Sequence, residues 1–136
     1  MCKTSLILEP SFRDSIIGAT RWSILYIANE LSNEKAIFEK EKLFECLLKI
    51  KKRADEENIP YIFGNKTYAE IFKDYEEEGF LTPVNPTNKY KVAFNIRYFI
   101  PEEKEKMKEI LSTYFNNTYQ IDLFNIITTE INACKS

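Results

Sequence analysis

The segment from Thr67 to Ile96 constrains the fold of this chain more than any other. It has the pattern of a helix that ends at a glycine and is followed by two short strands. Thr67 and Glu70 match the capping box, in which a threonine and a later glutamate satisfy free backbone N–H groups at a helix start. Gly79 supplies the left-handed conformation that commonly ends a helix. We therefore expect a helix over Thr67–Glu78.

The two runs that follow Gly79 have the composition of paired strands. Phe80–Val84 and Lys89–Ile96 are rich in β-branched and aromatic residues, and the second alternates apolar with polar side chains. Asn85–Asn88 between them is a cluster of turn residues. The sequence predicts a β-hairpin with one buried face and a short polar tip.

Two helices are expected before this segment. Apolar residues between Arg13 and Leu31 recur at the spacing of one buried helix face, and a second helix is expected from about Phe38 to Glu57. Its last turns carry a basic run of Lys49, Lys51, Lys52 and Arg53. Cations are favoured at a helix C-terminus, so a solvated helix end explains this run most simply.

The C-terminal part of the chain has the pattern of two further amphipathic helices. One begins at Pro101, a residue favoured at the first position of a helix, and the other runs to about Ile131. Together they carry more apolar surface than one small core needs. Their apolar positions include Met107, Ile110, Leu111, Tyr114, Phe115, Leu123, Phe124 and Ile127.

Composition argues against catalysis and against a cofactor. The chain of 136 residues has no histidine, which removes Ser–His and Cys–His pairs and imidazole metal ligands. Its glycines form no phosphate-binding loop. The acidic clusters have the character of solvated helix ends. We therefore expect a protein that is not an enzyme and that binds neither a metal nor a cofactor.

Cysteine usage and hydropathy predict the compartment. The three cysteines, Cys2, Cys46 and Cys134, lie far apart and form no CxxC pair, which fits a reducing cytoplasm better than a secreted disulfide framework. No apolar run approaches the length of a membrane span.

The net charge of −2 means that any nucleic-acid surface must gather its cations on one face.

The order of three helices, a hairpin and C-terminal helices resembles the winged helix-turn-helix family of DNA-binding proteins. In that family a recognition helix ends at a glycine and leads into a β-hairpin called the wing. Here Tyr75–Leu81 corresponds to the end of the recognition helix, and Asn88–Val92 corresponds to the returning strand of the wing. The resemblance covers residues 15–98. It implies an α+β, mainly α fold, with residues 1–100 as a DNA-binding domain bearing an N-terminal arm and residues 101–136 as a helical extension.

The resemblance also implies which residues meet duplex DNA. Base edges would be met by Asn65, Lys66, Thr67, Glu70 and Lys73 of the recognition helix. The wing would contribute Thr87, Asn88, Lys89 and Lys91, and flanking phosphates would be met by Lys51, Lys52 and Arg53. The helix is otherwise acidic, so Glu70 would repel phosphates unless the capping box holds it back.

Three interpretations of function follow from this resemblance. The first is a homodimeric transcriptional regulator, with the C-terminal apolar positions forming the dimer contact as in related regulators. The second is an adaptor for plasmid or phage DNA segregation with the same fold. The third is a winged-helix module that binds another protein and no DNA. For the C-terminal helices, packing back onto the first helix is the alternative to dimerisation.

Overall fold

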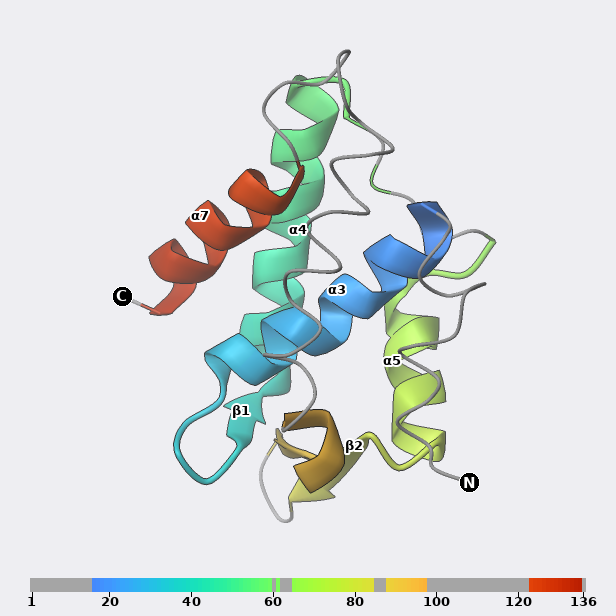
Figure 1. The fold of residues 1–136 in the computed structure, drawn as a ribbon, viewed down its shortest axis with the longest axis vertical. Helices are drawn as coiled ribbons and strands as arrows, with labels where there is room; N and C mark the ends of the chain where they lie inside the picture. The colour runs from blue at the N-terminus through green and yellow to red at the C-terminus, as the bar shows by residue number, and fades with distance from the viewer. Residues whose placement is uncertain (1–15, 60, 62–64, 85–87, 98–122, 136) are drawn as a thin grey trace.

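The computed structural model describes residues 16–59, 61, 65–84, 88–97 and 123–135. The fold is α+β and mainly helical, with a small three-stranded antiparallel sheet (Figure 1). The elements in chain order are α3 (Ile16–Leu31), β1 (Ile37–Glu39), α4 (Lys40–Glu56), α5 (Tyr68–Glu77), β2 (Leu81–Val84), β3 (Lys89–Val92) and α7 (Leu123–Lys135). Among these described elements, no helix is long and apolar enough to cross a membrane.

The sheet has the strand order β1-β3-β2, so the hairpin of β2 and β3 accepts an additional strand from earlier in the chain. That strand, β1, was not predicted, because the second helix was expected to begin at about Phe38. Instead Phe38 lies opposite Tyr90 of β3, with the two rings stacked at a centroid distance of 6.2 Å, and the helix begins at Lys40. Pairing with a distant strand decides the local conformation here.

The predicted strand Lys89–Ile96 is wrong in its second half. β3 ends at Val92, and residues 94–97 are helical, with the backbone N–H of Arg97 donating to the carbonyl of Ala93 at 2.9 Å. The helical turn buries Ile96 completely and leaves Phe94 85% exposed, where strand alternation had placed both on the buried face. Tertiary contacts of Ile96 and Arg97 therefore override the strand pattern.

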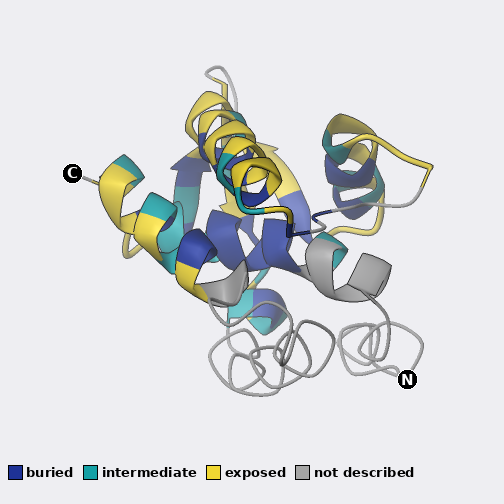
Figure 2. Cartoon of the chain, turned by 90° about the horizontal axis from the view of Figure 1, so that it is seen from above, coloured by how far each residue is buried: buried dark blue, intermediate teal, exposed yellow. Residues whose placement is uncertain are grey.

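Helix α3 runs through the centre of the core. Figure 2 shows the buried residues gathered at the centre and the exposed ones on outward faces of the helices. Apolar side chains from α3, α4, α5 and the sheet meet there, among them Ile24, Leu25, Leu43, Leu47, Phe72 and Val92. In both views α5 and α7 lie on opposite flanks of α4 (Figures 1 and 2).

Helix α7 packs against α3 and α4 of the same chain. Its residues Ile126, Ile127 and Ile131 are buried in the core. At the rim, the guanidinium of Arg53 lies 3.4 Å from the carboxylate of Glu130. For the described part of the C-terminal region, the structure thus shows packing back onto the first helix.

Candidate nucleic-acid interface

The first turn of α5 confirms the predicted capping box. The backbone N–H of Glu70 donates to the Thr67 hydroxyl at 3.2 Å, and the backbone N–H of Thr67 donates to the Glu70 carboxylate at 2.8 Å. The Glu70 charge is thereby held against the positive end of the helix dipole. Asn65, Lys66 and Lys73 are exposed beside it, as are Thr67 and Glu70 themselves. The predicted base-reading residues are therefore all accessible and lie within the first two turns of α5 or directly before it.

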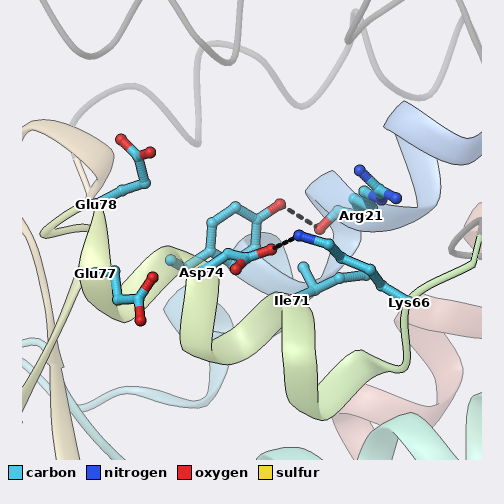
Figure 3. A pocket seen from close by; sticks show the side chains of 7 residues that line it. Arg21, Lys66, Ile71, Asp74, Glu77 and Glu78 are labelled. Atoms are coloured by element: carbon cyan, nitrogen blue, oxygen red, sulfur yellow. Dashed lines mark hydrogen bonds and ion pairs between the residues drawn. The ribbon is translucent and has the colours of Figure 1, made fainter.

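The other end of α5 is acidic. A hollow of about 400 Å³ is lined there by Asp74, Glu77 and Glu78, together with Arg21 and Lys66 (Figure 3). The ammonium group of Lys66 forms an ion pair with the Asp74 carboxylate across the surface of the helix. The side chain of Lys66 therefore points from the start of α5 toward its acidic end.

The wall of this hollow is fixed by a buried tyrosine. The hydroxyl of Tyr75 donates to the backbone carbonyl of Arg21 at 2.8 Å and so ties α5 to α3. Burial raises the pKa of this hydroxyl well above its usual range, so it remains a protonated donor at neutral pH. The geometry of α5 relative to α3 is therefore fixed by this partly buried hydrogen bond as well as by packing.

An aromatic joint of Phe38, Phe44, Tyr68, Phe72 and Tyr90 connects α4, α5 and the sheet. Phe72 contacts Tyr90 at a centroid distance of 4.9 Å and Phe44 at 5.5 Å, both edge to face. Partial burial raises the pKa of the Tyr90 hydroxyl, and the neighbouring Glu76 carboxylate raises it further. The joint fixes the start of α5 relative to β3 and α4.

Lys40 lies over this joint, a position that the sequence did not single out. Its ammonium group is 5.3 Å from the centroid of the Phe72 ring, 5.6 Å from Phe44 and 5.7 Å from Tyr90. Cation–π attraction holds the charge at this place. The backbone N–H of Lys40 donates to the carbonyl of Asn88 at 3.2 Å, which joins the start of α4 to the start of β3. No local sequence pattern marks Lys40, because two of its three rings, Phe72 and Tyr90, come from elements distant in the chain, and only Phe44 lies in its own helix.

The predicted wing residues lie on the outer face of the sheet. Lys89 and Lys91 are exposed on β3, and Asn88 is exposed at its start; Thr87 lies outside the described residues. In the strand register, Lys89 lies opposite Glu39, and Lys91 lies opposite Ile37. Lys89 thus faces the Glu39 carboxylate, and Glu41 lines the same hollow as Glu39, Asn88 and Lys89.

The basic run of α4 is not brought to the sheet. Lys51 is eleven residues beyond Lys40 in the same helix, which corresponds to about 16 Å along its axis. Lys51 pairs with Asp55 at 2.9 Å, whereas Arg53 is half-buried and pairs with Glu57 and Glu130. Lys52 is exposed beside them. The ion pairs of Lys51 and Arg53 thus lie at the end of α4, and that of Arg53 with Glu130 also joins α4 to α7.

The predicted dimer residues divide between α7 and the undescribed part of the chain. Ile127 is only 1% exposed and packs within its own chain. Leu123 and Phe124 begin α7. Residues 98–122, and with them Met107, Ile110, Leu111, Tyr114 and Phe115, lie outside the described residues.

Within the described ranges, no group of three or more carboxylate or cysteine side chains is placed to hold a metal ion. A comparison with models of protein families, with curated proteins and with solved structures finds no match to this chain.

Proposed function

We propose that residues 16–97 form a winged helix-turn-helix unit that binds duplex DNA. The observation that carries this proposal is the element order α3, β1, α4, α5, β2, β3, combined with the strand order β1-β3-β2. In this arrangement α4 and α5 are the helix pair, α5 is the recognition helix, and the β2–β3 connection is the wing.

The charge distribution assigns different roles to the two ends of α5. The helix start exposes Asn65, Thr67 and Lys73, whose side chains can meet base edges or phosphates, while the capping box withdraws Glu70. The lysines of β3 and Lys40 supply positive charge on the neighbouring elements. The acidic end of α5 would point away from the duplex, so only its first turns enter the groove.

A transcriptional regulator is the role we propose, and a DNA-segregation adaptor is the alternative within the same class. Either role is served by a homodimer, because two modules together read more sequence than one. The buried face of α7 is already occupied by its own chain. A dimer contact would therefore rest on the apolar positions from Met107 to Phe115.

One observation favours a second function, that of a protein-interaction module. Four carboxylates, Asp74, Glu76, Glu77 and Glu78, lie on the last turn of α5 and at its end. Arg21 of α3 and Lys66 line the hollow beside them. A basic protein segment suits this surface better than a phosphate backbone does.

Fluorescence anisotropy with a labelled duplex, repeated across salt concentrations, tests the proposal. Because each phosphate contact releases a counterion, about four lysine contacts predict that affinity falls about 100-fold for a fourfold rise in salt. Absence of binding at low salt would exclude both DNA-binding interpretations and leave the protein-interaction module.

A further inference from the structure

A second hollow lies at the base of the sheet, beside the end of β3. Its volume is about 550 Å³, and its lining includes Lys35, Ala36, Ile37, Lys91, Phe94 and Arg97. We call it the Phe94 hollow. Phe94 is the most exposed large apolar side chain of the described residues, at 85%. An aromatic face open to solvent beside several cations is the feature that needs explanation.

The floor of the Phe94 hollow is built by a turn that Asn33 organises. Its side-chain oxygen accepts hydrogen bonds from the backbone N–H groups of Lys35 at 2.8 Å and Ile37 at 3.1 Å. Ala36 between them has a φ of +66°, a left-handed conformation that is uncommon for alanine. The carbonyl of Ala36 accepts from the N–H of Val92 at 2.8 Å. The turn is thereby locked to β3.

Arg97 fixes the opposite wall. Its guanidinium donates to the side-chain oxygen of Asn29 at 3.0 Å, to the hydroxyl of Ser32 and to the carbonyl of Asn33 at 2.8 Å. These bonds join the helical turn that carries Phe94 to the end of α3. Because the Arg97 guanidinium is engaged in these bonds, Lys35 and Lys91 are the cationic residues of the hollow that can bind a ligand.

The charges around the ring are complementary to an anion. Lys35 and Lys91 are both exposed, and neither forms an ion pair within the described part of the chain. Glu34 is the acidic residue in the lining of the hollow. An aromatic face for a base, with cations beside it for the backbone, is the arrangement by which proteins hold single-stranded nucleic acid.

We propose that the Phe94 hollow binds an unpaired nucleotide of a single strand. The base stacks on the Phe94 ring, and the flanking phosphates are met by Lys35 and Lys91. The hollow has the size of a small-ligand site. This proposal goes beyond duplex binding by α5 and the wing, since bases within a duplex are stacked on each other and offer no free face.

The test is fluorescence anisotropy with a labelled oligothymidylate of about 12 nucleotides, a single strand without stable self-pairing. We expect Phe94→Ala to weaken binding about tenfold, because base stacking on an aromatic ring is lost. Phe94→Trp should bind at least as tightly as the original chain. Phe94→Leu, which keeps the apolar character but has no aromatic face, should behave like Phe94→Ala.

Leu48→Ala is the matched control, because Leu48 is the other exposed large apolar residue, at 54%, and lies on α4. It should leave oligothymidylate binding unchanged. Unchanged binding by Phe94→Ala, or full binding by Phe94→Leu, would overturn the stacking assignment. Polyglutamate that binds as tightly as oligothymidylate would also overturn it, because a general anion surface would then explain the data.

The same variants separate this proposal from duplex binding. Phe94→Ala should retain its affinity for a blunt duplex, because Phe94 is not among the residues assigned to the groove or the wing. If the unmodified chain binds oligothymidylate but does not bind duplex DNA, the proposed function is contradicted and the nucleotide site is still supported.

Discussion

Replacing Phe72 with alanine is expected to lower the free energy of unfolding by about 4 kcal/mol. Phe72 is 1% exposed and lies at the centre of the aromatic joint. Its ring contacts Tyr90 at a centroid distance of 4.9 Å, Phe44 at 5.5 Å and Phe38 at 6.4 Å. Truncation removes the buried ring, leaves a cavity between α4, α5 and the sheet, and removes one face under the Lys40 ammonium group.

Urea denaturation followed by circular dichroism measures this loss. Phe94→Ala is the matched control, because it removes the same side chain from an 85% exposed position and should change stability by less than about 0.5 kcal/mol. A loss below about 1 kcal/mol for Phe72→Ala would mean that the joint is not closely packed. The placement of α5 against the sheet would then be wrong.

Reversing the charges of Lys89 and Lys91 to glutamate is expected to weaken duplex binding about 100-fold at low salt. Both lysines are exposed on β3, on the outer face of the sheet, so the change should not disturb the core. The variant loses two phosphate contacts and adds two repulsive charges at the proposed wing. The slope of log affinity against log salt should also fall by about two.

The matched control reverses Lys51 and Lys52 on the far part of α4. These lysines are also exposed, and the change in net charge is the same, but the structure does not bring them to the sheet. Duplex affinity should fall by less than about threefold in this variant, through long-range electrostatics alone. Equal weakening by both variants would show that binding depends on net charge and not on the wing.

Local sequence chemistry predicted the elements that depend on neighbouring residues. The capping box at Thr67 and Glu70 and the helix stop at Gly79, with a φ of +86°, are both confirmed. Each of these is specified by residues within one turn of the chain. The pairing of β2 with β3 is confirmed as well, although β3 ends at Val92 and not at Ile96.

The features that the sequence missed depend on distant contacts. Strand β1 has only three residues and is defined by its pairing with β3. The helical turn at residues 94–97 is held by the bonds of Arg97 to the end of α3. No alternation or propensity within a short window contains this information.

The candidate site was predictable in part. The residues at the start of α5 and on β3 are exposed, as binding residues must be, whereas Arg53 is occupied by Glu57 and Glu130. Lys40 was missed because its aromatic partners are separated in the chain. The sequence left open whether Ile127 packs within its own chain or against a second copy, because an apolar helix face does not indicate which of the two covers it; in the structure Ile127 is buried within its own chain.

Titration of the isotopically labelled protein with duplex DNA, followed by amide chemical shifts, tests the proposed interface most directly. We predict that the largest shifts fall on Asn65–Lys73 and on Asn88–Lys91, at a salt concentration where binding is complete. Shifts that fall only on the far end of α4, on α7 or on the acidic end of α5 would contradict the winged-helix account of this chain.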